Sequence, residues 1–139
     1  MQRDMFKSKI HRIRVTGADV DYEGSITLDP DLMDAANILL NERVHVWNVT
    51  RGTRLETYAI LGTRGKGECV LNGAAAHLNK PGDLVIVATF AQMTEAEART
   101  HVPIVVLVDE KNHVREIRGV EKPNTRAPKV RVVPSAKKR

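Results

Sequence analysis

The chain has 139 residues, of which 42% are hydrophobic and 28% are charged, so its length and composition describe one globular domain rather than a disordered protein. A single cysteine, Cys69, excludes an intrachain disulfide. No apolar run approaches the roughly 20 residues that span a bilayer, and the N-terminus lacks the apolar stretch of a signal peptide. We therefore expect a soluble, cytoplasmic protein without membrane contact.

The excess of positive charge is confined to the C-terminal end. Residues 1–109 hold 12 Lys/Arg and 14 Asp/Glu, whereas residues 110–139 hold 10 Lys/Arg and 3 Asp/Glu. We expect residues 115–139 to form a basic, largely disordered tail, because they contain three prolines and few large apolar residues. The tail aids solubility in one interpretation and binds an acidic partner in the other. Because the body of the chain is not basic, we do not expect nucleic-acid binding.

The first half of the chain alternates β-branched segments with turn residues. Residues 9–16 predict a strand, and a second strand is expected to begin after Ser25. Asp29-Pro30 predicts a helix start, because Asp caps free N–H groups and Pro suits the first helical position. Four residues follow at helical spacing: Leu32, Ala35, Ala36 and Leu39. Residues 44–49 and 54–61 then predict a hairpin around the turn at 50–52.

The second half continues the same pattern. Residues 62–67 predict a glycine-rich loop, residues 69–72 a short strand, and Lys80-Pro81-Gly82-Asp83 a turn. The continuous apolar run 84–88 predicts a strand buried on both faces. Thr94 with Glu97 resembles a capping box that opens a short helix, and residues 103–108 predict another buried strand. Short strands with two or so short helices predict a mainly β, closed or nearly closed barrel, complete by about Val108.

Most familiar kinds of site are absent from the sequence. None of the five histidines has a Cys or His partner at metal-ligand spacing, so no metal site is predicted. No glycine-rich phosphate loop stands between a strand and a helix. Cys69 is interpreted as a small buried hydrophobe.

Glu23-Gly24-Ser25 has two interpretations. It is a turn between strands in the first. It is a self-cleavage site in the second, where the Ser25 hydroxyl attacks the preceding carbonyl and Gly24 permits a strained backbone. The ester formed would eliminate to dehydroalanine and hydrolyse to a pyruvoyl group. A pyruvoyl ketone condenses with amines as a Schiff base and withdraws electrons from them.

Several blocks decide between these interpretations, because together they closely resemble bacterial aspartate 1-decarboxylases. They run in one order from about Phe6 to Val114. The blocks are Lys9-Ile10-His11-Arg12, Val15-Thr16-Gly17-Ala18-Asp19, Tyr22-Glu23-Gly24-Ser25, Asp34-Ala35-Ala36, Val46-Trp47-Asn48-Val49-Thr50, Gly52-Thr53-Arg54, Thr57-Tyr58-Ala59-Ile60, Asn72-Gly73-Ala74-Ala75-Ala76-His77 and Pro81-Gly82-Asp83.

The resemblance implies a double-psi β-barrel with short helices over residues 1–114, assembled as a homotetramer. It also implies self-cleavage between Gly24 and Ser25, a covalent pyruvoyl cofactor from Ser25, and decarboxylation of L-aspartate to β-alanine for pantothenate and coenzyme A synthesis. The implied roles are: Ser25 and Tyr58, catalytic; Gly24, Ser25 and Thr57, processing; and Lys9, Arg54, Thr57, Asn72, Gly73, Ala74 and Ala75, substrate binding.

Elementary chemistry is compatible with these roles. A planar Arg54 guanidinium can hold one carboxylate of aspartate through two hydrogen bonds, and the Tyr58 hydroxyl can return a proton to carbon. Residues four apart on a strand share a face about 13 Å apart, so both can line one pocket. Thr57 would point away in a regular strand, which predicts a bend or bulge there if it also faces the pocket. On residue type alone, Arg54 is a solvated strand residue and Tyr58 is barrel core.

Two hypotheses follow for the whole protein. The first is a pyruvoyl-dependent aspartate decarboxylase. The second is an uncleaved, non-catalytic barrel that binds an acidic partner through its basic tail.

Overall fold

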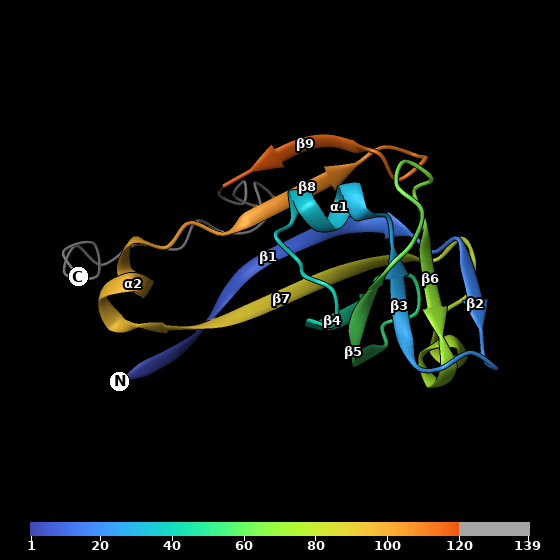
Figure 1. Cartoon of the computed structure of the whole chain (residues 1–139), viewed down its shortest axis with the longest axis horizontal. Coiled ribbons are helices and arrows are strands. Elements are labelled where there is room, and N and C mark those ends of the chain that lie inside the picture. Colours follow the sequence, from blue (N-terminus) through green and yellow to red (C-terminus); the bar gives the residue numbers. More distant parts are fainter. Residues whose placement is uncertain (120–139) are drawn as a thin grey trace, which may run out of the picture.

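The structure, a computed structural model, describes residues 1–119 and is mainly β (Figure 1). The expected fold class is confirmed. Nine strands form one mixed sheet in the order β2-β6-β3-β5-β4-β7-β1-β8-β9. The strands are β1 (Gln2–Arg14), β2 (Gly17–Asp19), β3 (Ser25–Leu28), β4 (Arg43–Asn48), β5 (Arg54–Leu61), β6 (Cys69–Asn72), β7 (Leu84–Thr94), β8 (Ile104–Val108) and β9 (Val114–Arg118); the helices are α1 (Pro30–Ala35), the 3₁₀ helix η1 (Gly73–Leu78) and α2 (Glu95–Thr100).

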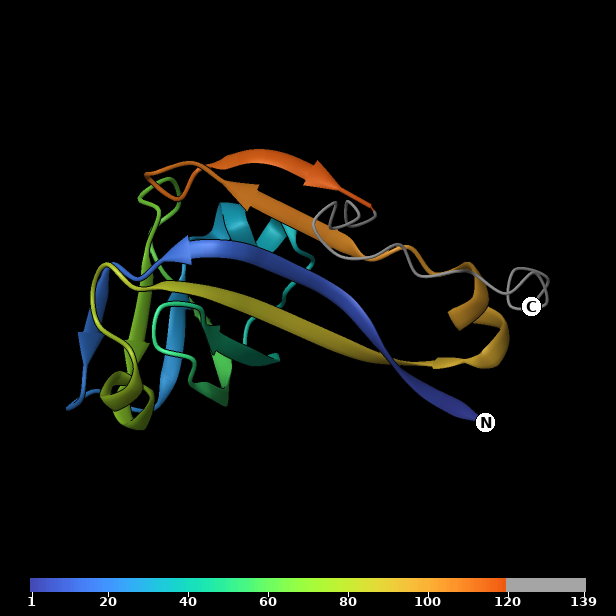
Figure 2. The same ribbon diagram turned by 180° about the vertical axis from the view of Figure 1, so that it is seen from behind.

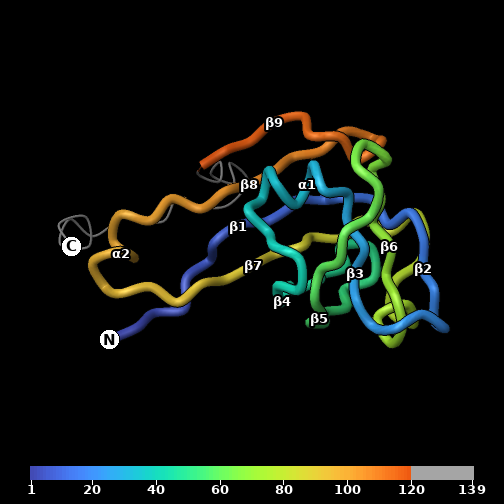
Figure 3. Tube along the Cα trace, in the orientation of Figure 1, coloured from blue at the N-terminus to red at the C-terminus, as the bar shows by residue number. Residues whose placement is uncertain are grey.

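The segment after β1 closes the sheet into a barrel. Val15 donates its backbone N–H to Asp83 O and Thr16 donates to Cys69 O, both at 2.8 Å. The chain therefore passes from the β1–β7 side directly to β6, against which β2 pairs in parallel. Figure 3 shows β2, β3 and β6 gathered at one end, while β1 and β7 run to the other. Aliphatic side chains fill the interior, among them Ile10, Ile13, Ile26, Leu71 and Val87, each fully buried.

Local sequence determinants form several elements as predicted. The Asp29 side chain accepts from Asp31 N at 2.8 Å and starts α1 with Pro30 in the first turn. The Thr94–Glu97 capping box is present in full at the start of α2. β5 occupies the predicted residues 54–61 and pairs with β4 as the expected hairpin.

Other boundaries differ from the expectations. β1 begins at Gln2 instead of Lys9, and β7 continues past Ala88 to Thr94, because the two strands pair antiparallel along their whole length (Figure 2). α1 ends at Ala35, which leaves Leu39 outside it and 71% exposed. The expectation that residues 84–88 are buried on both faces is wrong in part, since Leu84 and Ile86 are only half-buried.

β9 was not predicted at all. It pairs antiparallel with β8, with Val105 opposite Arg118 at one end and Val108 opposite Val114 at the other. The sheet therefore extends past Val108 and into the residues assigned to the tail. The sequence did not predict β9 because a five-residue strand rich in charged residues lacks an apolar pattern. The rest of the expected tail, residues 120–139, lies outside the described residues.

Candidate active site

Ser25 is buried at the start of β3 and its hydroxyl is held by hydrogen bonds. It pairs with Asn72 of β6 and is 1% exposed. Asn72 Nδ2 donates to Ser25 Oγ at 2.9 Å and to Thr27 Oγ1 at 3.0 Å. Ser25 Oγ in turn lies 3.4 Å from Glu23 O, which accepts from it. The hydroxyl is thus oriented next to the Gly24–Ser25 peptide bond.

Gly73 packs its backbone directly against Gly24. Its φ is +64°, a left-handed conformation that favours glycine. A Cβ at Gly73 would lie 2.8 Å from both N and Cα of Gly24 and 3.0 Å from Tyr22 O. The structure therefore brings Gly24, Ser25, Asn72 and Gly73, all predicted site residues, into one cluster.

The next two predicted residues continue η1. Ala75 is 7% exposed, and its carbonyl accepts from Asn79 Nδ2 at 2.9 Å. Ala74 is exposed. Of the two residues, only Ala74 therefore lies at the surface, while Ala75 is fixed inside by its bond from Asn79.

Tyr58 lies beside this cluster on the neighbouring strand. β3 and β5 pair in parallel with Ile26 opposite Ala59, and the residues that precede this pair are Ser25 and Tyr58. Tyr58 is 39% exposed. Tyr58 thus lies one strand away from Ser25, level with it in the register.

Arg54 shares the face of Tyr58, as predicted. β5 pairs with β4 in unbroken register, with Trp47 opposite Arg54 and Arg43 opposite Tyr58. Side chains four residues apart on β5 therefore point the same way. Arg54 Cζ lies 4.7 Å from the ring centroid of Trp47, a cation–π contact. Trp47, which the sequence analysis did not include in the site, therefore supports a predicted substrate-binding cation. Their opposition across a predicted hairpin was the signal that could have found this contact.

Thr57 points to the opposite face of β5 from Arg54 and Tyr58. The regular register of β4 and β5 rules out the bend or bulge expected at this residue. Thr57 is half-buried opposite Val44. Within one chain it therefore does not line the face that carries Arg54 and Tyr58.

Lys9 lies far from the cluster in the same chain. It pairs with Ala88 of β7, which pairs with His45 of β4, which pairs with Glu56 of β5. Three strand spacings separate Lys9 from β5, roughly 14 Å. Lys9 Nζ lies 5.9 Å from the ring centroid of Phe6. The structure thus leaves one predicted substrate-binding cation apart from the others.

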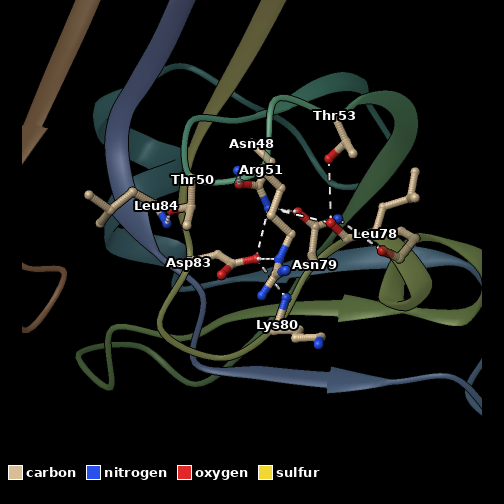
Figure 4. Close-up of polar contacts among 10 residues, drawn as sticks. Asn48, Thr50, Arg51, Thr53, Leu78, Asn79, Lys80, Asp83 and Leu84 are labelled. Carbon is tan, nitrogen blue, oxygen red and sulfur yellow. Dashed lines mark hydrogen bonds and ion pairs between the residues drawn. The ribbon is translucent and has the colours of Figure 1, made fainter.

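A buried polar cluster behind η1 was missed by the sequence analysis, which treated Asp83 as a turn residue. Asp83 Oδ2 accepts from Arg51 Nε at 2.6 Å and from Asn48 Nδ2 and Lys80 N, each at 2.9 Å (Figure 4). Burial raises the pKa of Asp83, but the hydrogen bonds from Arg51, Asn48 and Lys80 outweigh it and lower the pKa to about 2. Asp83 is therefore a fixed anion between η1 and the turn before β5.

Other polar features lie outside this region. A groove of about 870 Å³ between the end of β1 and the β8–β9 turn includes Arg12, Lys111 and Arg115 but no predicted site residue. Cys69 is fully buried, as predicted, and burial raises the pKa of its thiol to about 12. Within residues 1–119, no three His, Cys, Asp or Glu side chains gather into a metal-binding group. No helix in that range is long and apolar enough to cross a membrane.

The fold and site together define a mainly β barrel in which a buried serine, Ser25, follows an exposed Gly24 and is held by an asparagine beside a close-packed glycine. The sequence profile of the family described as "Aspartate decarboxylase" matches residues 1–115. The chain is similar to "Aspartate 1-decarboxylase" of Myxococcus xanthus (strain DK1622), at 59% identity over 88% of this chain and 98% of the relative. It is also similar to "Aspartate 1-decarboxylase" of Legionella pneumophila (strain Lens), at 60% identity over 84% and 87% respectively.

The chain belongs to the aspartate decarboxylase family. The resemblance stated from the sequence blocks is thereby confirmed.

Proposed function

We propose that this protein is a carboxy-lyase that converts L-aspartate to β-alanine and CO₂, a step that feeds pantothenate and coenzyme A synthesis. We further propose that it forms its own pyruvoyl group by cleavage between Gly24 and Ser25. The observation that carries the proposal is the hydrogen bond from Asn72 to the buried Ser25 hydroxyl, beside a Gly24 backbone held by Gly73.

Self-cleavage uses only atoms of this chain and water. The Ser25 hydroxyl oxygen bonds to the Gly24 carbonyl carbon, the Gly24–Ser25 C–N bond breaks, and the hydroxyl proton passes to the released amine. Elimination then removes the Ser25 Cα proton to solvent and breaks the Cβ–Oγ bond, which frees the Gly24 carboxylate and leaves dehydroalanine with a Cα=Cβ double bond. Water replaces the nitrogen as ammonia and leaves the pyruvoyl group. Asn72 orients the attacking oxygen through its Nδ2 donor.

The residues present fit such a group, since a buried hydroxyl is fixed at the required position in a cradle that a Cβ at Gly73 would fill. The pyruvoyl ketone supplies an electron-withdrawing carbonyl for the substrate amine. Arg54 binds the carboxylate that stays on the substrate, with two parallel hydrogen bonds available from its fork. Tyr58, beside Ser25 in the strand register, delivers a proton to the carbon that loses CO₂.

Assembly as a homotetramer explains the placement of Lys9. In one chain Lys9 is three strands from β5, and Arg54 and Tyr58 lie on an exposed face. A second copy packed against this face would supply a cation and exclude water from the site. Exposed apolar residues elsewhere on the surface, including Leu39, Leu61 and Leu78, offer further area for packing between copies. We also propose that Thr57 takes part in processing and that the protein is cytoplasmic. The proposed barrel domain is extended from residue 114 to Arg118, because β9 belongs to the sheet.

Intact mass of the purified protein tests the proposal. We expect a 24-residue chain that ends at Gly24 and a 115-residue chain that begins with the pyruvoyl group. Ser25→Ala should remain one chain because it has no hydroxyl to attack. Ser8→Ala is a matched control, since Ser8 is also fully buried and hydrogen-bonded, to Thr89 at 2.6 Å, yet lies on β1.

Borohydride added with aspartate should attach substrate to the 115-residue chain. Attachment to a lysine would point to other chemistry. An intact, inactive wild-type protein would instead favour the second hypothesis, an uncleaved barrel that binds an acidic partner.

A further inference from the structure

A polar cluster joins the two segments that carry the candidate site. Three of its members are almost fully buried: Asn48 at 3%, Asn79 at 1% and Asp83 at 4% exposure. Figure 4 shows them pointing toward one another between the turn after β4 and the end of η1. Burying polar groups is costly unless each is bonded, and these three side chains satisfy one another and the neighbouring backbone.

The buried Asn48 side chain contacts both segments. Its Nδ2 donates to Asn79 Oδ1 and Asp83 Oδ2, each at 2.9 Å, and lies 3.4 Å from Leu78 O. Its Oδ1 accepts from Arg51 N at 2.8 Å. An amide suits this place, because its NH₂ group offers two donors to one side and its oxygen accepts on the other.

On the first side, the cluster reaches the Gly24–Ser25 bond through η1. Asn79, held by Asn48, donates its own Nδ2 to Ala75 O at 2.9 Å. Ala75 lies two residues after Gly73, whose backbone packs against Gly24. The position of η1 therefore determines how Gly73 is pressed against Gly24.

On the second side, the cluster holds the turn that precedes Arg54. Backbone bonds link Gly52 N to Asn48 O and Asn48 N to Thr53 O, both at 2.8 Å. The Asn48 side chain adds the bond from Arg51 N, and Trp47, the preceding residue, stacks against Arg54. The turn and the guanidinium are thus located relative to the same amide.

We propose that Asn48 is a positioning residue. Its buried amide couples the position of the Gly24–Ser25 bond to the position of Arg54, the substrate-binding guanidinium. The proposal rests on the proposed function, in which both the cleavage and the aspartate carboxylate depend on these positions. It follows that a substitution at Asn48, which touches neither the Gly24–Ser25 bond nor the Arg54 guanidinium, affects self-cleavage and aspartate binding together.

The test compares Asn48→Ala with Asn112→Ala in the full chain. Asn112 is a matched buried asparagine, 2% exposed, whose side chain bonds to Arg14 N, Arg14 O and Gly67 O near the β8–β9 turn. Its φ of +62° makes alanine strained there, so the control should lose at least as much stability. Three quantities are measured for each: Tm, the time course of cleavage by intact mass, and kcat and KM for aspartate per cleaved chain.

We expect Asn48→Ala to cleave at least about tenfold more slowly than Asn112→Ala at the same Tm deficit, because small misplacements of reacting groups are costly. Among its cleaved chains, KM for aspartate should rise about tenfold while kcat changes less, since Arg54 binds rather than reacts. Asn79→Ala removes only the bonds on the η1 side, so it should slow cleavage and raise KM less than Asn48→Ala does.

Equal cleavage rates and equal KM values for Asn48→Ala and Asn112→Ala would overturn the positioning role. If Asn48→Ala does not fold, Asn79→Ala decides by the same comparison: slower cleavage than Asn112→Ala supports the role, and an equal rate overturns it. A wild-type protein that never cleaves is a different failure, because it removes the proposed function on which this role depends.

Discussion

Gly73 and Gly24 are in backbone contact so close that no side chain fits between them. A Cβ on Gly73 would lie 2.8 Å from the N and Cα atoms of Gly24, although the two glycines are 49 positions apart in the sequence. The contact ties the start of η1 to the bond that we propose is cleaved.

Gly73→Ala should therefore slow or abolish cleavage. Its left-handed φ costs alanine about 1–2 kcal/mol, and the new Cβ must also displace Gly24. Gly65→Ala is the matched control, since Gly65 has a φ of +84° and no neighbouring atom within 4 Å of the place where a Cβ would lie. Denaturing gels over time check the result; equal cleavage by the two variants would show that the Gly73–Gly24 contact is irrelevant to processing.

Tyr58→Phe should process normally but lose turnover. The ring and its place beside Ser25 remain, and only the proton donor is removed, so kcat should fall on the order of 10²–10⁴-fold. Steady-state kinetics on fully cleaved protein measure the loss. A wild-type rate would mean that water or another group delivers the proton.

Arg54→Lys should mainly raise KM for aspartate. Lysine keeps the charge but loses both the two-bond fork and the planar stacking on Trp47. Cleavage should proceed at the wild-type rate, because Arg54 lies four residues along β5 from Tyr58 and outside the Ser25 cluster. A fall in kcat with unchanged KM would assign Arg54 to the chemical step instead.

Asp83→Asn should remove part of the acid dependence of stability. The pKa of Asp83 is lowered to about 2 in the folded protein from 3.8, so its ionised form stabilises the fold above about pH 4. That contribution is lost as the pH falls from about 4 to 2. Tm measured from pH 7 to pH 2 should fall less steeply in the variant, with the two curves converging near pH 2. Asp34→Asn removes the same charge at an exposed site and controls for the change in net charge.

A chain that ends at Gly119 should fold, cleave and decarboxylate aspartate. It keeps β9 and every candidate site residue, and it loses 7 Lys/Arg and 1 Glu, a fall of 6 in net charge. A chain that ends at His113 lacks β9, exposes the edge of β8 and should have a lower Tm. Lost activity in the chain that ends at Gly119 would make residues 120–139 part of the working enzyme.

The sequence by itself determined the elements whose causes are local. Asp29-Pro30 starts α1, Thr94 and Glu97 cap α2, and residues 54–61 form β5, because caps and hairpin turns involve residues only a few positions apart. The shared face of Arg54 and Tyr58 followed from strand periodicity alone. The family also followed from the sequence, since its motifs lie in contiguous blocks.

Only the tertiary structure decided what depends on pairing between distant segments. Lys9 belongs to the same motif set as Arg54, yet three strand spacings separate it from β5. β9 forms because it pairs with the edge of β8, and the charged residues of β9 do not by themselves predict a strand. The bonds of Asn48 to Asn79 and Asp83 join positions 31 and 35 residues apart. A polar side chain reveals its type in the sequence, but its partner is set by the chain that folds against it.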